Sequence, residues 1–311
     1  MLYLSVYDMS DKPKSVTDIS HRKTLIIVSL ILVIVLLVSS LCVYMLVVDN
    51  NNESIHVKNE AELKKAVDNV KNGVPVCIIL DRDISLTDTL TISKNKNITL
   101  TSNGNKEFFK LFGTSYASTI FVDVGGVLRL DGIIVTHTDG TYGSGVVVSV
   151  GGIFIMLDGE ISKNISENFN INGGGVCNAG TFELYGGKIS DNVTPNNGGG
   201  VVNSVDAVFK MFGGVISNNT SLQMAGGGVD NSGTFEMSGG IISGNTAESI
   251  YSGQGGGVYH SWGTFEMSGG EISGNTAREG GGVYYRRDTF NWTGGTISGN
   301  TADDISKNLA W

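Results

Sequence analysis

The residues most able to do chemistry are charged side chains that recur at one position of a segment repeated six times. The residue that follows each repeat phenylalanine is, in order, Ile155, Glu183, Lys210, Glu236, Glu266 and Asn291. If copies stack at a strand spacing of ~4.8 Å, Glu236 and Glu266 become neighbours, and such like charges raise each other's pKa, as acid–base cleavage of a polysaccharide requires. Water on an exposed face screens most of this repulsion. We therefore interpret the column as a solvated charge ladder.

Aromatic side chains near the first strand of the repeat offer a second kind of chemistry, stacking on sugar rings. They are Tyr251, Tyr259, Trp262, Tyr284 and Tyr285. Their positions fit half-buried edge residues equally well, so both interpretations stay open. The densest charged cluster of the repeats, Arg286-Arg287-Asp288, occurs in one copy only.

Known catalytic and metal-binding patterns do not emerge from the rest of the chain. The four histidines and three cysteines have no metal-ligand spacing; they are His21, His56, His137, His260, Cys42, Cys77 and Cys177. The glycine-rich runs lack the Gly-Lys-Ser/Thr ending of a phosphate loop, and no G-x-S-x-G elbow occurs. We predict no catalytic, cofactor-binding or metal-binding residue, and enzymatic activity is left open but disfavoured.

The repeat that positions these side chains keeps four residues in every copy. Its clearest copy covers residues 255–277, and phenylalanine, isoleucine and asparagine follow one another at constant spacings of seven and three residues. The recurring residues are Val146, Val176, Val201, Val229, Val258 and Val283; Phe154, Phe182, Phe209, Phe235, Phe265 and Phe290; Ile161, Ile189, Ile216, Ile242, Ile272 and Ile297; and Asn164, Asn192, Asn219, Asn245, Asn275 and Asn300.

The spacing of these residues predicts one turn of a three-sided solenoid in each copy. Successive repeat isoleucines are 28, 27, 26, 30 and 25 residues apart, and each copy contains three short alternating strands bracketed by glycines. Stacking then places valine, phenylalanine and isoleucine in inward columns. The asparagines should form an inward hydrogen-bonded column of structural purpose. Leucine-rich repeats and propellers fit less well, because the leucine line and the 40-residue period are missing.

Length variation between copies concentrates at one corner. Each asparagine and the next repeat valine are separated by 12, 9, 10, 13 and 8 residues. Solenoids commonly place their binding surfaces on the face that carries such insertions. We therefore expect specificity to lie in these corner loops.

The motif G-G-G-V-x-N-x-G-T-F-x-M-x-G-G-x-I-S-G-N-T-A resembles the repeat of right-handed parallel β-helix surface proteins. These include adhesin-like proteins of methanogenic archaea and clostridia, and the motif is also similar to that of chlamydial polymorphic outer-membrane proteins. The resemblance covers about residues 140–305, with weaker pectin-lyase-like features back to residue 76. It implies an exported protein with an adhesive or envelope role.

The N-terminal part predicts export. Residues 1–23 form a polar tail expected to be disordered, and residues 24–48 are 25 residues without a charge, long enough for a transmembrane helix. Basic residues before this helix place the tail in the cytoplasm and the remainder outside; a signal that is removed is the alternative. Residues 49–58 are an expected linker. Residues 59–73 are an expected capping helix with an apolar stripe, ended by Gly73.

Charge argues against nucleic acid as a partner. The net charge is −9, the first 23 residues carry +1 and the apolar segment carries none, which leaves −10 for the remainder. We predict an all-β parallel β-helix over residues 74–305, with a short tail over residues 306–311. The expected function is adhesin-like binding to glycans or surface proteins, or an envelope role. The alternatives are a carbohydrate-active lyase or hydrolase and a spacer or fragment of a longer protein. The open C-terminal coil also predicts end-to-end self-association.

Overall fold

The computed structural model describes residues 54–103, 108–166, 173–286, 289–302 and 304–307. The predicted tail and transmembrane segment lie outside these ranges. Within them, no helix is long and apolar enough to cross a membrane.

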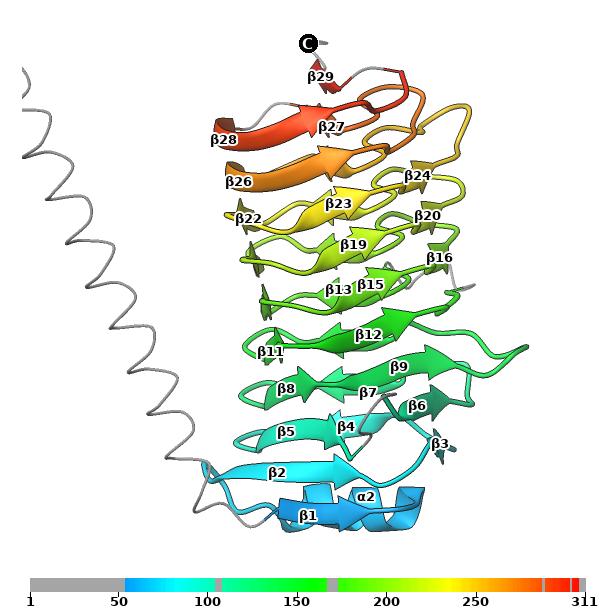
Figure 1. Cartoon of the computed structure of the whole chain (residues 1–311), viewed down its shortest axis with the longest axis vertical. Coiled ribbons are helices and arrows are strands. Elements are labelled where there is room, and N and C mark those ends of the chain that lie inside the picture. Colours follow the sequence, from blue (N-terminus) through cyan, green and yellow to red (C-terminus); the bar gives the residue numbers. More distant parts are fainter. Residues whose placement is uncertain (1–53, 104–107, 167–172, 287–288, 303, 308–311) are drawn as a thin grey trace, which may run out of the picture. The chain divides into compact units, whose positions relative to one another are not determined.

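The predicted parallel β-helix is confirmed. The chain winds through about 9 turns that stack one above another (Figure 1), and every strand pairing between described residues is parallel. The strands form three sheets. The largest contains β1 (Ser54–Val57), β2 (Pro75–Leu80), β3 (Ile84–Leu86), β5 (Asn97–Ser102), β6 (Lys110–Gly113), β8 (Val127–Asp131), β9 (Ile133–His137), β11 (Ile153–Met156), β12 (Gly159–Ser162), β14 (Thr181–Leu184), β15 (Lys188–Ser190), β18 (Val208–Met211), β19 (Val215–Ser217), β22 (Thr234–Met237), β23 (Ile241–Ser243), β26 (Thr264–Ser273) and β28 (Thr289–Ser298).

The other two sheets are smaller. The second contains β4 (Leu90–Ile92), β7 (Ile120–Val122), β10 (Val146–Val148), β13 (Val176–Asn178), β17 (Val201–Asn203), β21 (Val229–Asn231), β25 (Val258–His260), β27 (Val283–Tyr285) and β29 (Ile305–Lys307). The third contains β16 (Val193–Thr194), β20 (Thr220–Ser221) and β24 (Thr246–Ala247).

The repeat residues occupy the interior in register, as predicted. Phe182 pairs with Phe209, and the next repeat phenylalanines continue the column with ring centroids 4.6–4.9 Å apart. The valine and isoleucine columns are equally well aligned, for example at Val176 and Val201. Nearly all of these side chains are fully buried. One continuous apolar core therefore runs along the axis of the stack.

The asparagine column is also confirmed. The side-chain amide of Asn192 donates to Oδ1 of Asn219 at 2.9 Å, and the backbone N–H of Asn192 donates to the same oxygen at 3.1 Å. This pair of bonds repeats from Asn164 to Asn300. Each buried amide is thus satisfied only because another copy lies next to it, which makes the repeat cooperative.

A second buried ladder was not predicted. Asn178 donates its amide to Asn203, and Asn203 donates to Asn231, at 2.8 and 2.7 Å. The column ends at His260, whose Nδ1 lies 3.0 Å from the amide nitrogen of Asn231. Its side chains satisfy backbone groups at the corner between the first and second strands, for example the N–H of Gly180 and the carbonyl oxygen of Val208.

The Ser-Gly-Gly junction of the repeat differs from expectation. The sequence predicts a corner there, because glycines bracket each strand. In β26, and in β28 where Thr293 takes the place of the serine, the chain instead passes through the junction within one ten-residue strand, with a bulge in the pairing near Ser268. The second and third strands of each copy consequently belong to one sheet.

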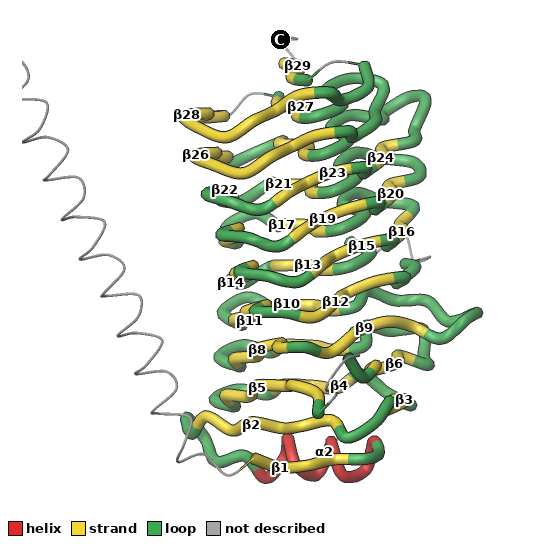
Figure 2. The backbone as a smooth tube through the Cα atoms, viewed as in Figure 1, coloured by secondary structure: helices red, strands yellow, loops and turns green. Residues whose placement is uncertain are grey.

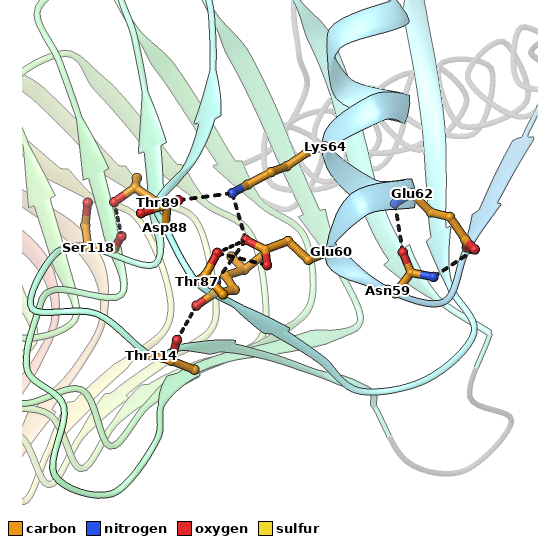
Figure 3. A network of polar contacts seen from close by, with 10 residues as sticks. Asn59, Glu60, Glu62, Lys64, Thr87, Asp88, Thr89, Thr114 and Ser118 are labelled. Atoms are coloured by element: carbon orange, nitrogen blue, oxygen red, sulfur yellow. Dashed lines mark hydrogen bonds and ion pairs between the residues drawn. The ribbon is translucent and has the colours of Figure 1, made fainter.

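The N-terminal end of the core is capped by helix α2 (Glu60–Asn69), which buries Leu63, Ala66 and Val67. Its first turn is tied to the neighbouring coil, because Glu60 accepts a hydrogen bond from the backbone N–H of Thr87 (Figure 3). Within the helix, Glu60 also pairs with Lys64 at 2.7 Å.

Two details differ from the predicted boundaries of this region. The helix ends at Asn69, four residues before Gly73, because the chain must turn back into β2. Residues 54–57, expected in the linker, form β1 and pair with β2, which extends the stack by one strand.

Candidate functional site

The column of charged residues is a surface ladder with mixed partners. Glu236 and Glu266 do lie on adjacent strands in register. Lys210, however, forms an ion pair with Glu236 at 3.5 Å, and Glu183 accepts a hydrogen bond from the Tyr185 hydroxyl at 3.1 Å. Both members of the ion pair are well exposed to solvent. The geometry therefore supplies no isolated pair of carboxylates for acid–base chemistry.

The aromatic residues divide between the two predicted environments. Tyr259 and Tyr284 are buried and stack with ring centroids 5.7 Å apart. Tyr285 is half-buried and packs against a repeat phenylalanine. Only Trp262 and Tyr251 are largely exposed, at 56% and 85%. Of the cluster at residues 286–288, only Arg286 is described; it is exposed and hydrogen-bonds the hydroxyl of Tyr259.

The corner loops carry the most distinctive exposed residues. The connections that follow β16, β20 and β24 lie along one edge of the stack (Figure 2). The longest loop, between Asn245 and Val258, is followed by the shortest, between Asn275 and Val283. Because the shorter loop does not reach as far, the longer one overhangs it. The overhang raises Ile250 and Tyr251 into solvent, with exposures of 73% and 85%.

The overhanging loop is held in place by polar contacts. The guanidinium of Arg278 donates to the carbonyl oxygens of Ile250 and Tyr251 at 3.2 and 3.3 Å. The hydroxyl of Ser249 accepts hydrogen bonds from the backbone N–H groups of Tyr251 and Ser252. The loop is consequently preorganised, although its two most prominent side chains are apolar.

The neighbouring loop extends the exposed apolar surface. The Ser252 hydroxyl donates to the carbonyl oxygen of Gln223 at 2.9 Å, which joins the two loops. On either side of Gln223, two more apolar side chains are exposed to solvent. We call these four side chains the corner ridge: Leu222, Met224, Ile250 and Tyr251.

A hollow of about 520 Å³ lies beside the ridge, between the overhanging loop and the short loop after it. Ala247 and Ala277 form part of its lining, together with Glu248, Ile250 and Arg278. No group of three or more potential metal ligands occurs among the described residues. The exposed apolar ridge beside this hollow has the character of a contact surface.

One buried acid was missed by sequence reasoning. Asp230 lies on the outward side of β21, yet it is only 6% exposed. The loop before β21 folds over it, since a Cβ atom added to Gly226 would lie 3.0 Å from the Asp230 Cα. Its Oδ1 has no hydrogen-bond partner, and burial raises the pKa of this carboxyl to about 7.

The sequence did contain a signal for this acid. The corresponding residue of the other copies is never charged; it is Val147, Cys177, Val202, Tyr259 or Tyr284. Cys177 at this position is half-buried, and its partial desolvation raises the pKa of the thiol to about 11. An aspartate in an otherwise uncharged column marks an unusual position.

Comparison of the chain with protein-family models, curated proteins and solved structures finds no match.

Proposed function

We propose that this chain is an adhesin-like surface protein that contacts a protein partner through the corner ridge. Residues 24–48 would anchor it as a single membrane span, with residues 1–23 in the cytoplasm and the β-helix outside the cell. The proposal rests on one observation. The most exposed apolar side chains of the corner loops lie on backbone that is held by hydrogen bonds from or to Arg278, Ser249 and Ser252.

The composition of the ridge favours a protein as its partner. Tyrosine, methionine and aliphatic side chains provide apolar contact area, and tyrosine is enriched at the energetic centres of protein interfaces. Because hydrogen bonds already order the loop, less conformational entropy is lost when it binds. Exposed apolar patches are unfavourable in water and commonly mark sites that a partner covers.

The alternative function, cleavage of an extracellular polysaccharide, has weaker support. It requires an ionisable group with a shifted pKa that a substrate can reach. The most strongly shifted carboxyl, that of Asp230, lies under the backbone of Gly226. Two exposed acids of the charged column, Glu236 and Glu183, instead have Lys210 and the Tyr185 hydroxyl as partners.

The adhesion proposal is tested with beads that carry the full-length chain in lipid nanodiscs, applied to cultured cells. We expect adhesion that is lost when the cells are first treated with protease. The double variant Ile250→Ser and Tyr251→Ser should abolish it. Val150→Ser is the matched control, because Val150 is 74% exposed and lies outside the ridge. Adhesion that survives the ridge variant, or that is unchanged by protease treatment, contradicts the proposal.

A further inference from the structure

A second hollow, distinct from the corner ridge, lies at the bends between the first and second strands of three consecutive copies. Four residues join β17 to β18, two join β21 to β22 and three join β25 to β26. Because the middle bend is the shortest, the bends on either side project beyond it. The space left above the middle bend measures about 360 Å³.

The bends are stacked closely, so this hollow has a firm base. Gly263 lies directly on the bend below it, since an added Cβ would come within 2.2 Å of the Gly233 carbonyl oxygen. The hydroxyls of Ser232 and Ser261 lie 2.8 Å apart. Beneath them, the amide of Asn231 contacts His260 in the second ladder. The short bend therefore cannot shift to fill the space.

The lining combines one aromatic ring with several oxygen groups. Trp262 supplies the ring and is more than half exposed, and Val205 adds apolar surface. Asp206, Ser232 and Thr234 also line the hollow, and their side chains contribute a carboxylate and two hydroxyls to this surface. Among the residues that line the hollow, Asp206 is the one ionisable side chain, so the site carries negative charge.

We propose that this hollow binds a neutral pyranose unit of a glycan. A sugar ring has apolar C–H faces that can pack on an indole, and a rim of hydroxyls that donate to a carboxylate. The volume lies at the lower end of the range for small-molecule sites, which suits a single sugar unit. A uronic or sialic acid would bring a second negative charge beside Asp206, so the site should reject it.

The backbone conformation at Asp206 makes this residue well suited to a test by substitution. Its φ is +63°, in the left-handed region that an L-residue adopts at a cost and glycine adopts readily. Asp206→Gly therefore removes the carboxylate without straining the bend. A loss of binding in this variant cannot be attributed to a misfolded bend.

The test uses the full-length chain in nanodiscs on an array of neutral-hexose, N-acetylhexosamine, uronate and sialylated glycans. We expect binding to neutral chains only, weakened about tenfold by Trp262→Ala and by Asp206→Gly. Asp206→Asn should keep part of the affinity and admit uronates. Trp292→Ala is the matched control for loss of an exposed tryptophan and should leave binding unchanged.

The outcomes for this site are separable from those for the corner ridge. The ridge variant Tyr251→Ser should bind glycans as the parent chain does. No binding to any neutral glycan, binding unaffected by Trp262→Ala, or preferential binding to uronates overturns the proposal. Any of these results leaves protease-sensitive adhesion through the ridge untouched.

Discussion

Replacement of the buried acid, Asp230→Asn, should stabilise the protein in a manner that depends on pH. The carboxyl is enclosed by the loop that contains Gly226, and its Oδ1 lacks a hydrogen-bond partner. Tyr259 on the next strand faces it, and Arg286 bonds to that tyrosine hydroxyl. Ionisation of Asp230 thus places a negative charge in a site that is largely shielded from water.

The magnitude and sign follow from the pKa of this group. Burial raises the pKa of Asp230 from 3.8 to about 7, and each unit corresponds to ~1.4 kcal/mol, so the difference amounts to about 4 kcal/mol. The folded protein holds the proton more tightly than the unfolded chain. As far as Asp230 determines it, the free energy of unfolding is therefore highest below about pH 4. It decreases between about pH 4 and pH 7 and stays constant above pH 7.

The assay is denaturant unfolding of the full chain, with the parent and Asp230→Asn compared at pH 4, 6 and 8. Comparison at each pH cancels the titration of all other groups. We expect nearly equal stabilities at pH 4 and an advantage for the asparagine variant that grows to as much as about 4 kcal/mol at pH 8. If the variant is less stable than the parent at pH 8, the ionised Asp230 has a favourable partner in the folded protein, and the reasoning is refuted.

Three further variants probe the scaffold by equilibrium unfolding. Asn219→Ala should cost about 3 kcal/mol, because it removes the acceptor for both the amide and the backbone N–H of Asn192; a cost like that of the exposed Asn103→Ala would argue against the ladder. Phe209→Ala should cost about 3–5 kcal/mol, since it opens a cavity between two stacked rings, and a smaller loss would mean that the column collapses to fill it. Asn59→Ala should cost about 1 kcal/mol through loss of the helix cap; an unchanged midpoint would show that α2 does not need that cap.

The inward columns could be predicted from the sequence because each occurs in six aligned copies. Constant spacing from Phe235 to Ile242 to Asn245 leaves one way to stack the copies, and the structure shows that register. The second ladder was harder to detect. It has only three asparagines and then changes to His260. The hydrogen-bonding role that these residues share is therefore not visible as one repeated residue type.

The positions that differ from expectation have local physical causes. Glycines at the Ser-Gly-Gly junction predict a corner, whereas near Ser268 they permit a bulge within one strand. The two hollows could not be predicted from any single copy, because each arises where a short connection lies next to longer ones. Burial of Asp230 likewise depends on how the preceding loop folds over its strand.

In our proposal the repeat is scaffold, and the overhanging loop between Asn245 and Val258 contacts the protein partner. The most direct measurement replaces residues 246–257 with the shorter loop of residues 276–282, which removes the overhang but keeps both stacked ends. We expect the exchanged protein to unfold at nearly the same denaturant concentration as the parent chain and to lose adhesion to cells. Adhesion that persists after the exchange would contradict it.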